Sequence, residues 1–334
     1  MKNFKKIVLG IVTVLTVMVL VACQSEKSEE NENSASVELI LDWVPNTNHT
    51  GLFVAEEMGY FEEAGVDVTI RRPPEGGGTE LVGSGQAEFG ISFQDTLAAP
   101  FEQGLPVTAV AAIVNHNTSG IISHKDVNIE KASDMAGRSY GTWNEAIETA
   151  MIKYIVEADG GNFEEVELIP NQADNSVVGL ANNMFDSAWI YYAWDGVMAD
   201  FQDVPTNYFN LTDFAEELDF YSPIIIANND YLENNPEEAR AVIQAIKRGY
   251  QYAIENPEEA ADILIDNAPE LEEQRDFVLA SQEWISEQYA NELETWGHME
   301  ADRWNTFYNW LYNNDLIEVD LTETDLFTNE FLGD

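Results

Sequence analysis

Polar and aromatic side chains gather in residues 41–60, LDWVPNTNHTGLFVAEEMGY. The first half of this stretch carries Asp42, Trp43, Asn46 and His49 within eight residues. Carboxylate, amide and imidazole groups can hydrogen-bond to the edge of a small ligand, and an indole can stack on a flat ring. From Thr50 onward the apolar spacing predicts a helix that stops at Gly59. We therefore predict that the loop before this helix is one wall of a binding site.

Four later clusters carry similar side chains, and each follows a predicted strand. They are Phe93, Gln94 and Asp95; Asn115 and His116; Trp143, Asn144 and Glu145; and Tyr191, Tyr192, Trp194 and Asp195. Ligands of open α/β sheets bind at the carboxyl ends of strands, so we expect these clusters to share one site with the opening loop. Packing at the edge of a core would account for two of the three aromatic residues in the last cluster.

Catalytic and metal-binding patterns do not accompany these clusters. The sequence has no G-x-S-x-G or H-E-x-x-H motif, its single cysteine is Cys23, and its four histidines lack ligand spacing. The glycine run 73–79, PPEGGGT, lacks the Lys-Ser/Thr pair of a phosphate loop. We predict a binding protein without catalytic residues, metal or cofactor.

The elements that must position the clusters alternate between β-rich runs and helical patterns from Val37 to Ala227, which favours α/β units with largely parallel sheets. After Asn228 the sequence reads as helical, with Asn-Pro starts at residues 235–236 and 256–257. The aromatic residues of this tail have spacings typical of a core: Trp284, Trp296, Trp304, Tyr308, Trp310 and Tyr312. The predicted strands are 37–41, 66–71, 89–92, 107–114, 121–124, 139–141, 166–169, 188–191 and 224–227.

The N-terminus has the pattern of a bacterial lipoprotein signal peptide over residues 1–22. A basic start, MKNFKK, precedes an apolar run and then Leu20-Val21-Ala22-Cys23, which resembles a lipobox. The apolar run is shorter than the ~20 residues needed to span a bilayer. We expect lipidation of Cys23, a flexible tether over residues 23–36, and a monomer anchored to the extracellular face of the cell membrane.

Charge and length narrow the function classes. The 334 residues have a formal net charge of −46, which repels nucleic acid and anionic lipid. A chain of this length can form two lobes of ordinary domain size. No nucleic-acid partner is therefore expected.

Several segments together resemble the pyrimidine-binding lipoproteins of thiamine-precursor ABC importers: residues 42–70, 73–95, YGTWNEAIETAM and YYAWDG. The resemblance implies a type II periplasmic-binding-protein fold, with one lobe from residues 37–124 and 223–334 and the other from 125–222. It also implies that the clusters bind a heteroaromatic thiamine precursor, formylaminopyrimidine or hydroxymethylpyrimidine, for an ABC permease and its ATPase. Asp195 and the stretch Asn144–Ala146 depart from what the resemblance leads us to expect.

Two other readings stay open. A receptor of the same fold could bind a flavin, or a sulfonate or nitrate, although the clusters hold no basic residue to pair with an oxyanion. The related pyrimidine synthases are enzymes of this fold that use pyridoxal phosphate and a cysteine-rich iron motif. With Cys23 as its single cysteine, this chain lacks that iron motif.

Overall fold

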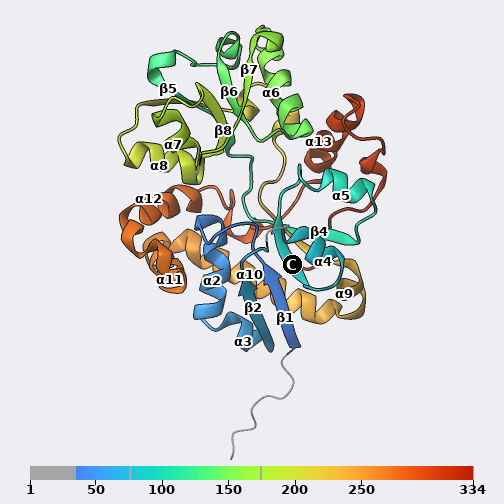
Figure 1. Cartoon of the computed structure of the whole chain (residues 1–334). Coiled ribbons are helices and arrows are strands. Elements are labelled where there is room, and N and C mark those ends of the chain that lie inside the picture. Colours follow the sequence, from blue (N-terminus) through green and yellow to red (C-terminus); the bar gives the residue numbers. More distant parts are fainter. Residues whose placement is uncertain (1–34, 75–76, 174, 334) are drawn as a thin grey trace, which may run out of the picture. The chain divides into compact units, whose positions relative to one another are not determined.

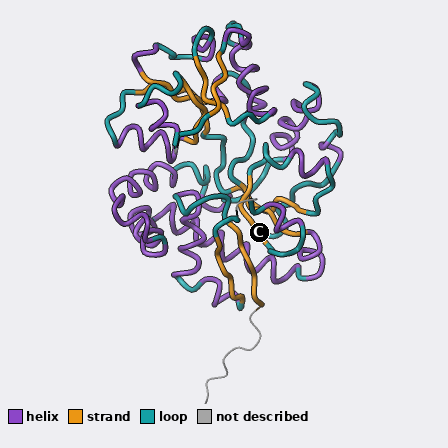
Figure 2. Tube along the Cα trace, viewed as in Figure 1, coloured by secondary structure: helices purple, strands orange, loops and turns teal. Residues whose placement is uncertain are grey.

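The computed structural model describes residues 35–74, 77–173 and 175–333 (Figure 1). The predicted signal peptide, Cys23 and the tether up to residue 34 lie outside the described residues. Helices surround two five-stranded sheets (Figure 2). The strand order is β2-β1-β3-β10-β4 in the first sheet and β7-β6-β8-β5-β9 in the second. We call each sheet with its helices a lobe, as in the type II periplasmic-binding-protein fold.

Within the described residues, one strand of each sheet runs against the other four. In the first sheet β1 is parallel to β2 and β3, whereas β10 is antiparallel to β3 and β4. In the second, β6 is parallel to β7 and β8, whereas β5 is antiparallel to β8 and β9. The first sheet contains β1 (Ala35–Ile40), β2 (Val66–Arg71), β3 (Phe89–Ser92), β4 (Val107–Ala112) and β10 (Ile224–Asn228). The second contains β5 (Ser119–His124), β6 (Ser139–Thr142), β7 (Glu167–Pro170), β8 (Ser187–Tyr191) and β9 (Thr206–Asn210).

Residue type explains which strands the sequence predicted. Every residue of β3 and β10 is buried, as expected for central strands that read as continuous apolar runs. The edge strand β9, TNYFN, was not predicted, because three of its five residues are Thr or Asn. A short polar strand of this kind has no apolar pattern to reveal it.

The chain passes between the lobes twice, through residues 113–118 and 211–223. The predicted lobe boundary at residue 124 is too late, because β5 pairs with β8 and β9 of the second sheet. One hydrophobic core cluster contains residues of both sheets, including Ala109 and Ile226 with Ile121 and Tyr140. Each lobe therefore has its own sheet, but the two lobes share part of one hydrophobic core.

The helix α2 (Thr50–Glu57) carries the opening loop and packs tightly against α10 (Pro236–Glu255). A Cβ atom at Gly249 would stand 2.0 Å from the Gly51 carbonyl oxygen, so only glycine allows this approach. The predicted stop at Gly59 is confirmed, since its φ is 71° before α3 (Tyr60–Ala64). The opening loop is thus mounted on a closely packed helix pair.

The helical tail consists of α10, α11 (Pro257–Asn267), α12 (Arg275–Ser286) and α13 (Ala301–Asn313). Both predicted prolines occupy the starts of their helices, at Pro236 and Pro257. The predicted core aromatic residues are buried or partly buried, except Tyr312, which is exposed on the outer face of α13. The remaining helices are α4 (Thr79–Gly83), α5 (Ala98–Glu102), α6 (Ala146–Ala158), α7 (Ser176–Ala181), α8 (Val197–Phe201) and α9 (Asn229–Asn234). Among the helices described, none is long and apolar enough to cross a membrane.

Candidate binding site

The opening loop follows β1 and ends in a short 3-10 turn, η1 (Thr47–His49). The side chain of Asn46 caps this turn: its oxygen accepts a hydrogen bond from the Asn48 amide at 2.9 Å, and its Nδ2 donates to the Val44 carbonyl at 3.0 Å. Asn46 is buried. Both polar atoms of its side chain therefore stabilise the loop. We expected this amide group to hydrogen-bond to the edge of a ligand, but its oxygen and its nitrogen each already have a partner within the protein.

His49 is fully buried and uses both ring nitrogens within the protein. Nδ1 accepts a hydrogen bond from the Asn46 amide at 3.2 Å, so Nε2 carries the proton and donates to Asp42 Oδ1 at 2.6 Å. The imidazole therefore orients Asp42 and leaves neither nitrogen for a ligand. The second carboxylate oxygen of Asp42 takes no part in the bond to His49. Trp43 beside it is 47% exposed.

Helices α10 and α12, together with Tyr289 just after α12, hold the opening loop from behind through hydrogen bonds. Thr50 Oγ1 donates to Gln282 Oε1 at 2.5 Å, and Tyr250 OH donates to the Asn48 carbonyl at 2.7 Å. Tyr289 OH donates to the Thr47 carbonyl. Buried polar groups that are satisfied in this way favour one loop conformation over others. The network thus fixes the backbone that presents Trp43.

The cluster after β3 divides into three roles. Phe93 stacks on Tyr191 of the other lobe, with ring centroids 5.7 Å apart and planes at 24°. Gln94 is fully buried: it accepts from the Tyr221 amide at 2.9 Å and donates to the Trp304 carbonyl at 3.0 Å, so its amide supports the fold. Asp95 is buried, and its Oδ1 has no hydrogen-bond partner among the described residues. Burial raises the pKa of Asp95 to about 6.

A continuous row of aromatic rings runs from Phe93 through the second lobe. Its centroid separations are 5.7 Å from Phe93 to Tyr191, 6.0 Å from Tyr191 to Trp189, and 5.2 Å from Trp189 to Trp143. The outer member, Trp143, is 44% exposed. We did not predict Trp189, although it lies two residues before Tyr191 on β8 and so shares its face.

The turn that presents Trp143 is built around one buried carboxylate, Glu148. It accepts hydrogen bonds from Tyr140 OH and Thr142 Oγ1, each at 2.8 Å, and from the amides of Trp143 at 3.1 Å and Glu145 at 3.3 Å. Glu148 is the third residue of α6, a position favoured for such capping. The side chains of the predicted site residues Asn144 and Glu145 are exposed at this turn.

The last cluster forms a single π-helical turn, η5 (Tyr192–Gly196), after β8. Tyr192 packs on Trp284 at 5.0 Å, and Trp194 packs on Phe277 at 4.7 Å, so these two aromatic residues seal the contact with α12 as the core-edge alternative predicted. Burial raises the pKa of Asp195 to about 6. Burial also raises the pKa of the Tyr191 hydroxyl, which the negative charges of Asp95 and Asp42 raise further. The Tyr191 hydroxyl itself lies 3.3 Å from Ser222 Oγ.

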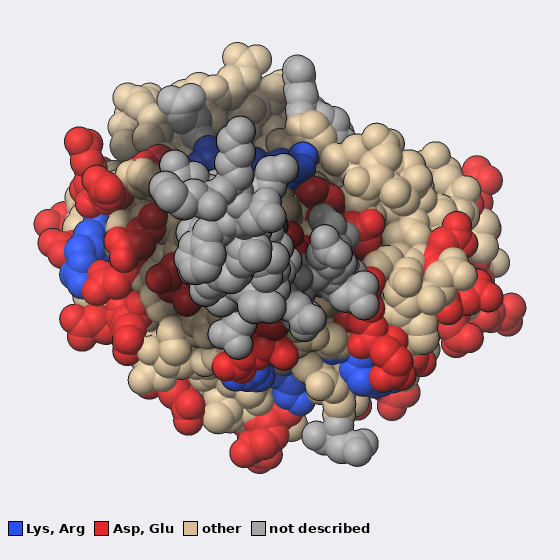
Figure 3. Space-filling model, turned by 90° about the horizontal axis from the view of Figure 1, so that it is seen from below, with Lys and Arg blue, Asp and Glu red and all other residues tan. Residues whose placement is uncertain are grey.

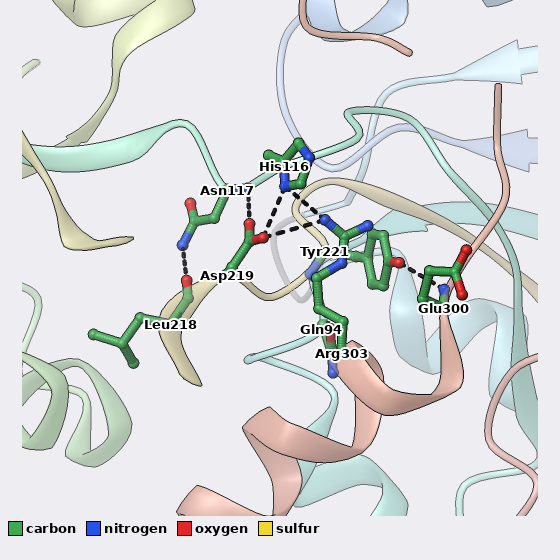
Figure 4. Close-up of polar contacts among 8 residues, drawn as sticks. All are labelled: Gln94, His116, Asn117, Leu218, Asp219, Tyr221, Glu300 and Arg303. Atoms are coloured by element: carbon green, nitrogen blue, oxygen red, sulfur yellow. Dashed lines mark hydrogen bonds and ion pairs between the residues drawn. The ribbon is translucent and has the colours of Figure 1, made fainter. Parts of the chain in front are cut away.

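The cluster of Asn115 and His116 lies in the first crossover, and His116 is tied to the second crossover and to α13 (Figure 4). His116 Nδ1 lies 2.7 Å from Asp219 Oδ2 and 2.7 Å from Arg303 Nη1, and Arg303 stacks 4.0 Å from the Tyr221 ring centroid. Asn117 also donates to Asp219 and to the Leu218 carbonyl. Burial raises the pKa of Asp219, but hydrogen bonds from His116 and the Asn117 amide, with the charges of His116 and Arg303, outweigh burial and lower it. The predicted residue Asn115 has a buried Nδ2 without a partner in the described residues.

We call the opening loop and the four later clusters together the rim. The rim carries acidic side chains. Asp42, Asp95 and Asp195 supply carboxyl groups, and the five clusters themselves contain no lysine or arginine. Arg303, which reaches His116, is paired with Asp219. On the face seen from below in Figure 3, acidic side chains predominate over basic ones. Among the described residues no group of His, Cys, Asp and Glu has the arrangement of a metal site. The rim suits a flat ligand that donates hydrogen bonds better than it suits an anion.

Comparisons with known proteins agree with this chemistry. The model of the family described as "NMT1/THI5 like" matches residues 46–260. A formylaminopyrimidine-binding protein of Halalkalibacterium halodurans is 28% identical over 98% of this chain and 99% of its own length. A 4-amino-5-hydroxymethyl-2-methylpyrimidine phosphate synthase of Legionella pneumophila is 24% identical over 70% of this chain and 74% of its own.

The fold is also that of solved solute-binding proteins. The alkanesulfonate-binding protein SsuA from Xanthomonas axonopodis pv. citri, solved with bound MOPS, superposes with a TM-score of 0.66 over 89% of this chain and 99% of that chain. Its sequence identity is 10%, so this likeness concerns the fold. It supports the two-lobe architecture expected from the sequence.

Proposed function

Because this chain belongs to the NMT1/THI5 like family, we propose that it is a non-enzymatic receptor that binds a thiamine pyrimidine precursor and delivers it to an ABC permease. The relative from Halalkalibacterium halodurans is named for binding formylaminopyrimidine, and it matches nearly the whole chain. The observation that carries the proposal is the aromatic row that joins the lobes, at a tyrosine whose pKa the charges of Asp95 and Asp42 raise. Flat faces beside acidic edges fit an aminopyrimidine.

The proposed ligand matches these groups in both shape and hydrogen bonding. A 4-aminopyrimidine has two π-faces, ring nitrogens that accept and an amino group that donates. Trp43, Trp143 and Tyr191 are the proposed stacking surfaces. Asp42 and Asp195 are the proposed edge groups, because carboxyl oxygens can accept hydrogen bonds from the amino group of the ring. The predicted residues Phe93, Asn115, Asn144 and Glu145 stay in the proposed site, whereas Asn46, His49, Gln94 and Trp194 support it from behind.

Binding can be tested by calorimetry on the purified chain. We expect saturable binding of formylaminopyrimidine or hydroxymethylpyrimidine, with a change in tryptophan fluorescence and no turnover of the ligand. Native mass spectrometry of the protein as purified adds a second readout through any ligand that copurifies. Riboflavin tests the flavin alternative in the same titration. Failure of both pyrimidines to bind would remove the ligand assignment, and binding of riboflavin alone would replace it.

A synthase activity is the alternative that the Legionella pneumophila relative raises. A pyridoxal phosphate reaction of that kind needs a lysine to form a Schiff base. The rim clusters contain no lysine, which favours a receptor. An absorbance band from a Schiff base after addition of pyridoxal phosphate would revive the enzyme hypothesis.

We also propose that the chain is a lipid-anchored monomer on the outer face of the cell membrane. This part rests on the sequence of residues 1–23, since these lie outside the described residues. Intact mass of the chain extracted from membranes should show an N-terminal lipid on Cys23. The substitution Cys23→Ala should release the protein from the membrane fraction without changing ligand affinity.

A further inference from the structure

A chain of hydroxyl groups joins the opening loop of the first lobe to the turn η5 of the second. Ser281, on α12, is fully buried, and its Oγ lies 2.5 Å from the Ala193 carbonyl oxygen and 2.7 Å from Thr47 Oγ1. A carbonyl only accepts, so Ser281 spends its single proton on Ala193 and Thr47 must donate to Ser281. The direction of both bonds follows from this.

Both ends of this relay lie next to proposed ligand-binding residues. Thr47 begins η1, the turn that holds the backbone after Trp43, and Ala193 lies between Tyr191 and Asp195 in η5. The packing around Ser281 brings the same segments together, since Trp194 packs on Phe277 one helical turn before Ser281. Water has little access to the bonds, because Thr47, Ala193 and Ser281 are all buried. Their loss would remove the side-chain hydrogen bond to the Ala193 carbonyl at a buried position.

We propose that Ser281 is a positioning residue that couples the opening loop to the turn η5, through the relay from Thr47 to Ser281 to Ala193. Neither segment can shift relative to α12 without breaking one of the two bonds. The coupling makes the arrangement of Trp43 depend on the arrangement of Tyr191 and Asp195. Its effect on ligand affinity rests on the proposed function, whereas its effect on the two segments in the absence of ligand does not.

The helix α12 offers a matched control in Ser286. This serine is also buried, accepts a hydrogen bond from the side chain of Gln282 at 2.9 Å, and donates to the carbonyl of Ala253 at 2.9 Å. It therefore has the same bonding pattern as Ser281, but both of its partners belong to the first lobe. The two serine-to-alanine variants differ mainly in whether a lobe-to-lobe bond is lost.

The test is amide hydrogen exchange of the full-length chain in detergent, without ligand, for wild type, Ser281→Ala and Ser286→Ala. We expect Ser281→Ala to raise exchange in residues 43–50 and 190–197 by about three- to tenfold, and Ser286→Ala to leave 190–197 unchanged. A third variant, Thr47→Val, keeps the side-chain shape and should accelerate residues 43–50 alone. Equal exchange of residues 190–197 in the two serine variants would overturn the proposal.

Ligand affinity provides the second readout. We expect Ser281→Ala to weaken binding of formylaminopyrimidine about three- to tenfold and Ser286→Ala to leave it within twofold of wild type. Wild type that binds no pyrimidine would overturn the proposed function and leave the exchange result standing. Unchanged affinity in Ser281→Ala, with wild-type binding intact, would refute the coupling at the site.

Discussion

The opening loop and the turn before α6 are two walls of the proposed site, and each presents an exposed tryptophan. The two walls are held in place in different ways. The opening loop behind Trp43 is held by neutral groups on several elements, among them Thr50, Tyr250 and Tyr289. The turn behind Trp143 depends on one buried carboxylate, Glu148. A distributed network loses one bond when one member is removed, whereas a central carboxylate leaves all of its donors unpaired at once. The walls should therefore differ in how they respond to single substitutions.

The largest effect is expected from Glu148→Ala. The change leaves two hydroxyl groups and two backbone amides without their acceptor, and we expect a loss of about 4 kcal/mol in the free energy of unfolding. Urea titration measures it. Glu148→Gln keeps one acceptor oxygen and the shape of the side chain, so its loss should be clearly smaller. If the two variants were equally stable, the charge and its second oxygen would not be what holds this turn.

Asp95→Asn examines a buried carboxyl group with one oxygen, Oδ1, that has no hydrogen-bond partner among the described residues. Burial raises the pKa of Asp95 to about 6, so in the folded state the group resists ionisation and stability falls as pH rises from about 4 through 6. The neutral amide should therefore make the protein more stable at pH 8, by about 3 kcal/mol at most, and should change little at pH 4. Urea titrations at both pH values measure this. A gain that did not depend on pH would contradict the assigned cause.

Gly249→Ala disturbs the support of the opening loop from below. A Cβ atom there would collide with the Gly51 carbonyl oxygen, which forces α2 and α10 apart at a cost of about 2 kcal/mol in the free energy of unfolding. Thermal or urea unfolding would detect the change. Gln244→Ala, at an exposed position of the same helix, is the control and should change stability by less than about 0.5 kcal/mol. Unaltered stability of Gly249→Ala would mean that the helices separate without cost.

The smallest expected effect compares the two exposed tryptophans directly. Trp43→Ala and Trp143→Ala each remove a proposed stacking surface, and each should weaken ligand binding by about 0.5–1.5 kcal/mol with little change in unfolding. Calorimetry with formylaminopyrimidine gives both values. Unchanged affinity in one variant would remove that wall from the site.

The sequence predicted the architecture because buried strands leave a strong apolar pattern. β2 and β3 have the predicted bounds. The helix starts at Pro236 and Pro257 are confirmed, because the effect of a proline on the backbone depends on its immediate neighbours. The edge strand β9 was missed because it buries little apolar surface. Local chemistry is enough for such elements and insufficient for a strand with few apolar residues, such as β9.

Side-chain roles were harder to predict, because the partner of a polar residue can lie far along the chain. Gln94 has the residue type of a ligand-binding group, but its hydrogen bonds go to Tyr221 and Trp304, more than a hundred residues away. His49 likewise serves Asp42. Ser281 and Glu148 carried no motif that would mark them. Residue type and position on the rim indicate which residues gather there, and only the fold shows which of them are already paired.

The antiparallel strand β10 has a consequence for how the molecule is made. It lies between β3 and β4, so the first sheet receives a central strand only when residues 224–228 are available, after all five strands of the second sheet have been synthesised. We expect the second sheet to form first during biogenesis. Until β10 is available, the edges of β3 and β4 that pair with it have no partner. The lobe that begins the described part of the chain is then the last to be completed.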